Sequence, residues 1–137
     1  MTHAPTKPVI LITGGSRGMG AATARLAAER GYDVAFSYLR DAAAADSVAA
    51  DIAQRGARAL ALQADSADPD QVAQLFAAID VRFGRIDVLV NNAAMLERQS
   101  RMEDLGFARM QRIFAVNAIG PMLCAQQAVR RMAYRYQ

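Results

Sequence analysis

An apolar segment that runs directly into a glycine-rich turn is the feature that most restricts how this chain can fold. Residues 9–12 read Val-Ile-Leu-Ile, and residues 13–20 read Thr-Gly-Gly-Ser-Arg-Gly-Met-Gly. The continuous apolar run predicts a strand that is covered on both faces. A helix should follow the turn and end near Gly31, which suits a left-handed helix end. Its apolar positions recur at helical spacing, as Met19, Ala22, Leu26 and Ala27.

Strand and helix patterns then alternate along the chain. We expect strands over residues 8–13, 32–38, 58–64 and 86–90. The helix between the second and third strands would pack through Val48 and Ile52. Asp68 and Pro69 form a start signal for the next helix, since Asp is a favoured N-cap and Pro suits the first turn. The apolar residues of that helix are Val72, Leu75, Phe76, Ile79 and Phe83.

This alternation predicts an α/β fold, a doubly wound parallel sheet with helices on both faces. The 137 residues, 53% of them apolar, are enough for one domain with a core. We expect residues 1–7 to form a disordered tail and residues 8–137 to form an incomplete domain, truncated after about four strands.

Composition excludes several function classes. No segment resembles a signal peptide or a membrane span, so we expect a cytoplasmic protein without membrane contact. The single cysteine, Cys124, has no partner for a disulfide or a metal site and should be a buried thiol. The net charge of +3 is spread along the chain, which gives nucleic-acid binding little support. The arginines near the C-terminus are predicted to be a solvated helix end: Arg130, Arg131 and Arg135.

The glycine turn is the first element with a chemical role. A turn that follows a strand and opens a helix lets backbone amides approach a pyrophosphate, and the helix dipole favours its negative charge. Glycines also serve tight turns and close packing, so the alternative is a purely structural turn. The strand-turn-helix context favours phosphate binding.

Four motifs in order resemble the short-chain dehydrogenase/reductase family of classical type. They are Thr13-Gly14-x-x-x-Gly18-x-Gly20, Asp65, Asn91-Asn92-Ala93-Ala94 and Asn117. The resemblance covers essentially every residue after Pro8 and implies the N-terminal, NAD(P)-binding portion of a Rossmann fold. Within the family the chain is most similar to bacterial glucose 1-dehydrogenases and 3-oxoacyl carrier protein reductases.

The resemblance also implies a set of cofactor contacts. Asp65 would accept a hydrogen bond from the adenine amino group, although Asp is equally suited to cap a turn with Ser66. Asn91 would mainly tie neighbouring strands together, and the backbone at Ala93 would face the cofactor ribose. The full set is Gly14, Ser16, Arg17, Gly18, Met19, Gly20, Tyr38, Arg40, Asp65, Ser66, Asn91 and Ala93.

The residues after the second predicted strand indicate which cofactor is bound. NAD-specific proteins place an acidic residue about 20 residues beyond the glycines, to hold the ribose 2′-hydroxyl. This chain has Tyr38-Leu39-Arg40 there. Arg40 and Arg17 could hold a 2′-phosphate by charge-assisted hydrogen bonds, so NADP is predicted over NAD. Asp41 is the competing feature, because it could turn inward or pair with Arg40.

The last predicted helix carries one apolar stripe, and Asn117 lies in it. By resemblance, Asn117 is a catalytic residue that helps hold a water in a proton relay; the alternative is a buried amide satisfied by its packing neighbours. Pro121 cannot donate to the carbonyl of residue 117, which predicts a local kink. The stripe consists of Met110, Ile113, Phe114, Pro121, Cys124 and Ala128.

The family's active serine and its Tyr-x-x-x-Lys motif would lie beyond Gln137. We therefore expect an NADP-dependent oxidoreductase acting on a carbonyl or alcohol substrate in a longer parent, which forms a homo-oligomer by resemblance. The chain itself is expected to be inactive and to self-associate through an open sheet edge. The alternative is a non-catalytic nucleotide-binding or partner-binding fragment, which the coding sequence after codon 137 would distinguish.

Overall fold

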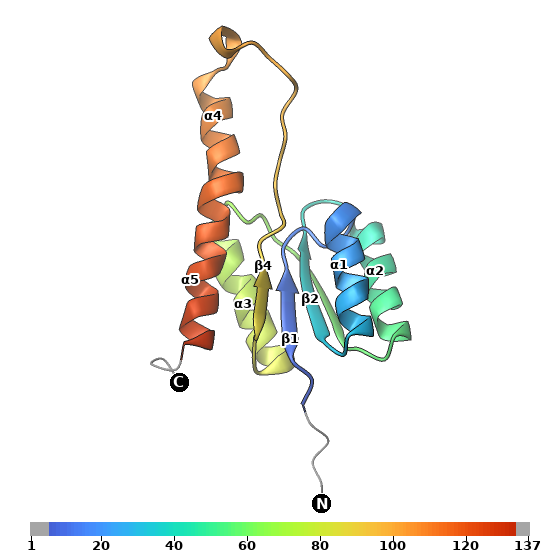
Figure 1. Cartoon of the computed structure of the whole chain (residues 1–137). Coiled ribbons are helices and arrows are strands. Elements are labelled where there is room, and N and C mark those ends of the chain that lie inside the picture. The colour runs from blue at the N-terminus through green and yellow to red at the C-terminus, as the bar shows by residue number, and fades with distance from the viewer. Residues whose placement is uncertain (1–5, 134–137) are drawn as a thin grey trace, which may run out of the picture.

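Four parallel strands form one sheet in the order β3-β2-β1-β4. The computed structural model describes residues 6–133. Helices α1 and α2 cover one face of the sheet, and α3 and α5 cover the other (Figure 1). The predicted doubly wound fold is therefore confirmed. The strands are β1 Val9–Ile12, β2 Asp33–Tyr38, β3 Ala59–Gln63 and β4 Val88–Val90.

The helices begin and end close to the predicted signals. Asp68 caps α3 by accepting hydrogen bonds from the backbone N–H groups of Asp70 and Gln71, at 2.9 and 3.3 Å. Gly84 ends the same helix with a φ of 73°, which favours glycine. The helices are α1 Gly18–Glu29, α2 Ala42–Gln54, α3 Pro69–Phe83, α4 Phe107–Phe114 and α5 Gly120–Met132.

Strand β1 separates two halves of the core. Ile10 and Ile12 pack against α1 and α2, whereas Val9 and Leu11 face α3 and α5. Because successive strand residues point to opposite faces, the apolar run 9–12 serves both layers. Val48 and Ile52 of α2 are fully buried, as the sequence predicted. So are the α3 residues Val72, Phe76 and Ile79, with Leu75 nearly so.

The predicted apolar stripe of α1 is wrong in part. Met19 is 81% exposed and Leu26 is 50% exposed. The helix instead packs through a face of alanines, Ala21, Ala24, Ala27 and Ala28. These small side chains let α1 lie close to β1 and β2, and the larger side chains of Met19 and Leu26 point outward.

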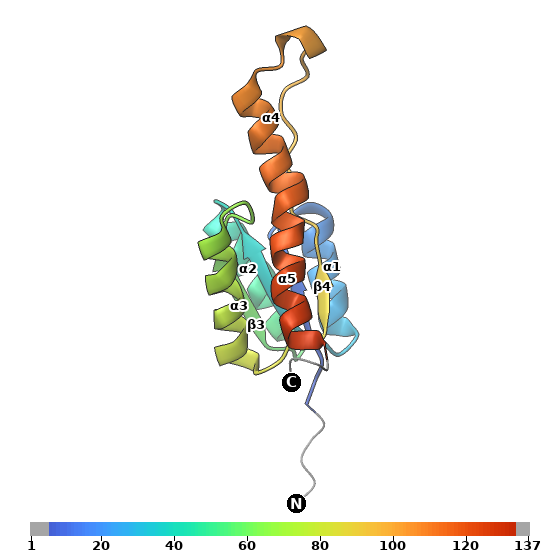
Figure 2. The same ribbon diagram turned by 90° about the vertical axis from the view of Figure 1, so that its left-hand side faces the viewer.

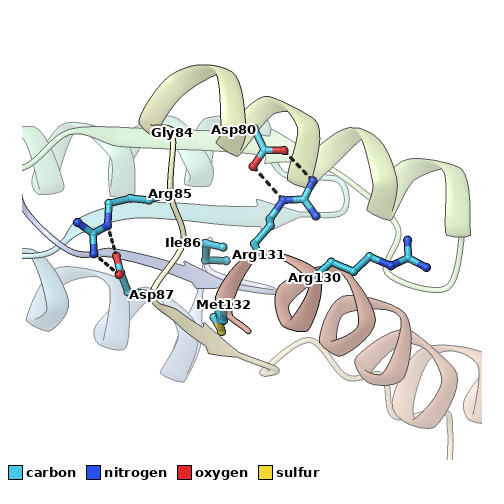
Figure 3. A pocket seen from close by; sticks show the side chains of 8 residues that line it. All are labelled: Asp80, Gly84, Arg85, Ile86, Asp87, Arg130, Arg131 and Met132. Atoms are coloured by element: carbon cyan, nitrogen blue, oxygen red, sulfur yellow. Dashed lines mark hydrogen bonds and ion pairs between the residues drawn. The ribbon is translucent and has the colours of Figure 1, made fainter. Parts of the chain in front are cut away.

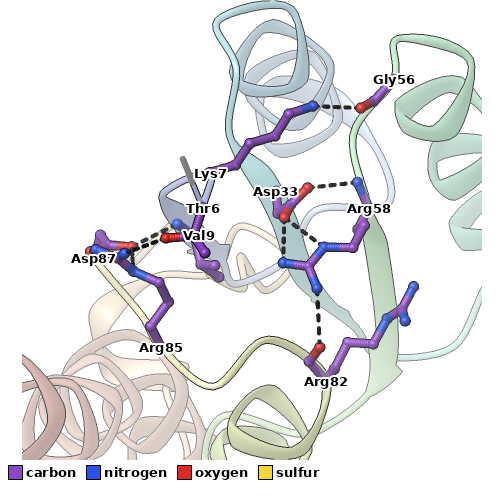
Figure 4. A network of polar contacts seen from close by, with 9 residues as sticks. All are labelled: Thr6, Lys7, Val9, Asp33, Gly56, Arg58, Arg82, Arg85 and Asp87. Atoms are coloured by element: carbon purple, nitrogen blue, oxygen red, sulfur yellow. Dashed lines mark hydrogen bonds and ion pairs between the residues drawn. The ribbon is translucent and has the colours of Figure 1, made fainter. Parts of the chain in front are cut away.

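Ion pairs fasten the end of the sheet that lies opposite the glycine turn (Figure 4). The carboxylate of Asp33, on β2, is buried and accepts from the backbone N–H and the guanidinium of Arg58, at 2.8 and 2.7 Å. Asp87 accepts from the backbone N–H of Val9 at 2.7 Å and pairs with Arg85. Burial alone would raise the pKa of Asp87, but the hydrogen bonds from Arg85 and Val9 and the Arg85 charge hold that pKa below its ordinary value.

The C-terminal arginines are less solvated than the sequence predicted. The guanidinium of Arg131 donates to both carboxylate oxygens of Asp80, at 2.8 and 2.7 Å, and so ties α5 to α3 (Figure 3). Arg130 is exposed, as expected. Arg135 and residues 1–5 of the tail predicted over residues 1–7 lie outside the described residues. The last two residues of that tail are described, and Lys7 donates to the carbonyl of Gly56 at 2.5 Å. The domain boundary at residue 8 stays a prediction.

An arm projects from the sheet above the ends of the strands (Figures 1 and 2). It consists of the segment 91–106, which contains a 3₁₀ turn at Met102–Asp104, and of α4. A π-helical turn at Ala115–Ile119 joins α4 to α5, and there the N–H of Gly120 bonds the carbonyl of Ala115. This turn directly precedes Gly120 and Pro121, and the kink predicted near Pro121 stays a prediction.

The π-helical turn also corrects the stripe predicted for this helix. Its extra residue shifts the register, so that Phe114 is 66% exposed and Asn117 is exposed rather than buried. The buried residues recur every four positions instead, as Val116, Gly120, Cys124 and Ala128. Cys124 is fully buried, as predicted. No helix within residues 6–133 is long and apolar enough to cross a membrane.

Candidate functional site

The glycine turn is fastened to the end of β4 by a set of short hydrogen bonds. The hydroxyl of Thr13 accepts from the backbone N–H groups of Asn92 and Ala93, both at 3.0 Å. The side-chain amide of Asn92 donates to the carbonyls of Thr13 and Gly14, both at 3.0 Å. The turn is therefore held from outside its own segment.

The strand-tying role predicted for Asn91 belongs to Asn92. The side chain of Asn91 donates to the carbonyl of Pro121 at 3.2 Å, and so connects the end of β4 to α5. Neighbouring residues at the end of an extended strand point in opposite directions, and here the Asn92 amide is the one that reaches the turn after β1. The sequence motif does not say which one.

Strand β2 holds the turn from the other side. The hydroxyl of Ser37 accepts a hydrogen bond from the N–H of Gly14 at 3.1 Å. The carbonyl of Ser37 accepts one from the N–H of Gly15 at 2.9 Å. A Cβ on Gly15 would collide with the side chain of Phe36. The turn thus lies flat on β2 because Gly15 has no side chain.

These contacts shape a cleft of about 600 Å³ at the carboxyl ends of the strands, where ligands of open parallel sheets bind. We name it the glycine-turn cleft. Every predicted cofactor contact lines it except Gly18 and Asn91. The lining residues are Gly14, Ser16, Arg17, Met19, Gly20, Ser37, Tyr38, Leu39, Arg40, Ala64, Asp65, Ser66, Asn92, Ala93, Ala94, Met95, Glu97, Arg112 and Val116.

Helix α1 begins at this cleft without a cap. Asp41 caps α2 and Asp68 caps α3, but the N-cap residue of α1, Arg17, makes no side-chain cap, and the first turn of α1 has no acidic residue. Gly18 opens the helix with a φ of 55°, and a Cβ there would meet no atom of the described chain. The positive end of the α1 dipole is therefore left for an anion from outside the chain.

Two arginines stand beside this helix start. Arg17 and Arg40 are exposed, and within residues 6–133 neither side chain forms a hydrogen bond or an ion pair. The competing partner considered for Arg40 is engaged elsewhere, because the carboxylate of Asp41 accepts the N–H of Ala44 at 2.9 Å and caps α2. Among the described residues the cleft thus offers two unpaired cations, Arg17 in the glycine turn and Arg40 after β2.

Asp65 combines the two roles that its sequence context left open. One carboxylate oxygen accepts the N–H of Ala67 at 2.9 Å, which is the predicted turn. The other accepts from the guanidinium of Arg112 at 3.0 Å. Asp65 nevertheless lines the cleft, so the turn role leaves the carboxylate available to a ligand.

Asn117 does not line the glycine-turn cleft. It lies on the π-helical turn, where its amide oxygen accepts the N–H of Met95 at 2.8 Å and its nitrogen donates to the carbonyl of Met95 at 2.9 Å. This pair of bonds fixes the backbone beside the cleft.

The arm also contains an ion pair between Glu97 and Arg109, whose charged atoms are 3.7 Å apart, and Arg109 donates a hydrogen bond to the carbonyl of Arg98.

Sequence reasoning missed the roles of four residues whose hydrogen bonds shape the site. Thr13 and Asn92 stood within the quoted motifs, but their roles depend on contacts across the sheet. Ser37 and Arg112 carried no signal, because their partners lie 23 and 47 residues away along the chain. Within the described residues no group of three or more His, Cys, Asp or Glu side chains could hold a metal ion.

Comparison with known proteins agrees with this geometry. The family model described as short chain dehydrogenase matches residues 8–137. An uncharacterized oxidoreductase of Escherichia coli, YgfF, is 44% identical over 127 residues, which cover 93% of this chain and 51% of the relative. A 3-oxoacyl-[acyl-carrier-protein] reductase of Synechocystis is 39% identical, with the same coverage.

A solved structure of a related protein has the same fold. A short chain dehydrogenase from Burkholderia cenocepacia in complex with NADP superposes with a TM-score of 0.87 at 40% identity, over 91% of this chain and 51% of that one. The chain therefore spans about half the length of the relatives it matches.

Proposed function

The chain belongs to the short-chain dehydrogenase family, and on that premise we propose that it supplies the cofactor-binding part of an NADP-dependent oxidoreductase. When bound, NADP(H) supplies a hydride acceptor or donor for an alcohol or carbonyl substrate. The observation that carries this proposal is the uncapped start of α1, which lies in the glycine-turn cleft beside two arginines whose side chains have no partner among residues 6–133.

Each part of the cleft has a role in binding the dinucleotide. The backbone of the turn from Gly14 to Gly20 binds the pyrophosphate, helped by the α1 dipole. Asp65 accepts from the adenine amino group, with Ser66 beside it, and the backbone at Ala93 faces the ribose. Asn91 supports the end of β4 through its bond to Pro121.

The preference for NADP follows from charge. Arg17 and Arg40 bind the 2′-phosphate, and Tyr38, the last residue of β2, lines the cleft with them. A carboxylate that would hold the 2′-hydroxyl of NAD is missing from residues 38–40, and Asp41 is used by the α2 cap. The NADP complex of the relative from Burkholderia cenocepacia supports the same choice.

Asn117 acts in the longer parent as part of a proton relay. Its amide already holds both polar backbone atoms of Met95. An amide has two N–H donors and two lone pairs, so one donor and one lone pair remain for a water. The same bonds make Asn117 a fixed point from which that water can be oriented.

A binding experiment tests the cofactor choice. Titration of the 137-residue chain with NADP and with NAD, followed by calorimetry, should show tighter binding of NADP. Arg40→Ala should weaken NADP binding by about 10- to 100-fold, the equivalent of one charge-assisted hydrogen bond, and leave NAD binding nearly unchanged. Arg30→Ala is the matched control, because Arg30 is an exposed arginine at the opposite end of α1. The proposal would be refuted if the wild type bound NAD as tightly as NADP. It would also be refuted if Arg40→Ala left the ratio of NADP affinity to NAD affinity unchanged.

Turnover belongs to the longer parent in this proposal. The 137 residues contain one lysine, Lys7, and no Tyr-x-x-x-Lys motif. The pure chain should therefore bind NADPH without oxidising it in the presence of small carbonyl compounds, and steady NADPH consumption would contradict this. The cytoplasmic location, the homo-oligomer of the parent and the lack of nucleic-acid binding stay predictions from the sequence.

A further inference from the structure

One ion pair joins the arm to the glycine-turn cleft. The guanidinium of Arg112, on α4, donates to a carboxylate oxygen of Asp65, which lies directly after β3, and the two atoms are 3.0 Å apart. Both side chains are partly shielded, with 41% of Arg112 and 23% of Asp65 exposed. Both residues also line the cleft. The pair therefore lies where a bound cofactor would meet it.

The backbone at Asp65 is fixed without Arg112. Its N–H donates to the side-chain oxygen of Gln71 at 2.8 Å, and the amide nitrogen of Gln71 donates to Asp68 at 2.9 Å. Ala67 then donates to one carboxylate oxygen. A single donor leaves the carboxylate plane free to rotate, because the terminal torsion of Asp is broad. A second donor on the other oxygen, which is Arg112, fixes that plane.

We propose that Arg112 is a positioning residue, which orients the Asp65 carboxylate so that it accepts the adenine amino group of the cofactor. This inference rests on the proposed function. Each oxygen of an ionised carboxylate can accept two hydrogen bonds, so the bonds to Ala67 and Arg112 leave one acceptor position on each. Arg112 orients Asp65 without using up its capacity to bind a ligand.

Arg112 also changes the charge that the cofactor meets. An unpaired carboxylate in the cleft would repel the phosphates of the dinucleotide, and the guanidinium compensates that charge. Substituting Arg112 should therefore weaken binding of any dinucleotide and, separately, reduce the preference for adenine. Only the second effect reports the orientation of Asp65.

The experiment compares NADP with its hypoxanthine analogue, which carries a carbonyl oxygen in place of the amino group. Calorimetry on the 137-residue chain measures both dissociation constants. The wild type should prefer adenine by about 10-fold or more, as expected for one hydrogen bond to a charged group. In Arg112→Met the preference should fall to within about 3-fold, because a rotating carboxylate forms that bond only part of the time.

Two further variants complete the design. Arg112→Lys keeps the charge but loses the planar fork, so its adenine preference should lie between those of the wild type and the Met variant. Arg25→Met is the matched control, because Arg25 forms a similarly exposed ion pair with Asp51 far from the cleft, at 2.7 Å. It should keep the wild-type preference.

The outcomes separate the inference from the proposed function. A wild type that binds neither dinucleotide contradicts the proposed function. A wild type that binds NADP but shows no adenine preference overturns the inference alone, and so does an Arg112→Met preference equal to that of the wild type or larger. If circular dichroism shows that Arg112→Met has lost its helices, the Lys variant decides, and an unchanged adenine preference in that variant overturns the inference.

Discussion

Gly20 is the position where one added methyl group should disturb the cleft most. A Cβ on Gly20 would lie 2.6 Å from the side-chain nitrogen of Asn92 and 3.0 Å from the carbonyl carbon of Gly14, and closer still to the oxygen of that carbonyl. Two of these three atoms belong to the backbone and cannot rotate away. The turn has to open, and Asn92 has to give up its bonds to Thr13 and Gly14.

The size of the effect follows from three contributions. Overpacking in a tight site costs about 1–3 kcal/mol. Two lost neutral hydrogen bonds cost about 1 kcal/mol each. The higher helix propensity of alanine offsets about 1 kcal/mol of this destabilisation. Gly20→Ala should therefore destabilise the fold by about 2–4 kcal/mol, which lowers the urea midpoint by about 1–2 M for a chain of this size.

Urea unfolding followed by far-ultraviolet circular dichroism measures this shift. Gly106→Ala is the matched control, because Gly106 has an ordinary φ of −68° and a Cβ there would meet no atom of the described chain. That variant should be neutral, or more stable by up to about 1 kcal/mol through the unfolded state. Equal midpoints for the Gly20 and Gly106 variants would refute the packing argument.

Three further predictions concern other parts of the molecule. The pKa of Asp87 lies below its ordinary value of 3.8, so its ion pair with Arg85 stabilises the fold above that pH, and the contribution disappears as pH falls through the folded-state pKa. The stability difference between wild type and Asp87→Asn should therefore shrink below about pH 4 in acid-unfolding curves, and a constant difference would contradict it. Burial raises the pKa of Cys124 to about 11, so iodoacetamide should label this thiol only in urea, and fast labelling of the native chain would be inconsistent with its burial. We also expect the chain to self-associate, because β4 ends the sheet of the described residues and Met122 on α5 is 66% exposed; a single monomer species in sedimentation velocity at all concentrations would rule this out.

Local chemistry made parts of the fold predictable. Asp68 and Pro69 marked the start of α3, and the spacing from Val72 to Ile79 gave its buried face. These signals act between residues within one or two turns of each other, so a sequence pattern contains them completely. The glycine turn could also be recognised from residues 14–20 alone, although Asn92 and Ser37 hold it in place from outside that segment.

Predictions failed where the deciding contact came from elsewhere in the chain. Met19 and Leu26 had the spacing of a buried stripe, but α1 packs against the sheet through its alanines, whose small side chains allow close approach. The inserted residue of the π-helical turn moved Phe114 and Asn117 to the surface. Neither outcome is visible in hydrophobic periodicity alone.

The sequence by itself determined the order of strands and helices, the glycine turn, the family and most of the residues that line the cleft. All of these follow from side-chain types at short spacing. Only the tertiary structure decided that Asn92 ties β4 to the turn and that Arg112 holds Asp65. The physical reason is that a hydrogen bond depends on where two atoms lie in space, and 47 residues of chain separate Asp65 from Arg112.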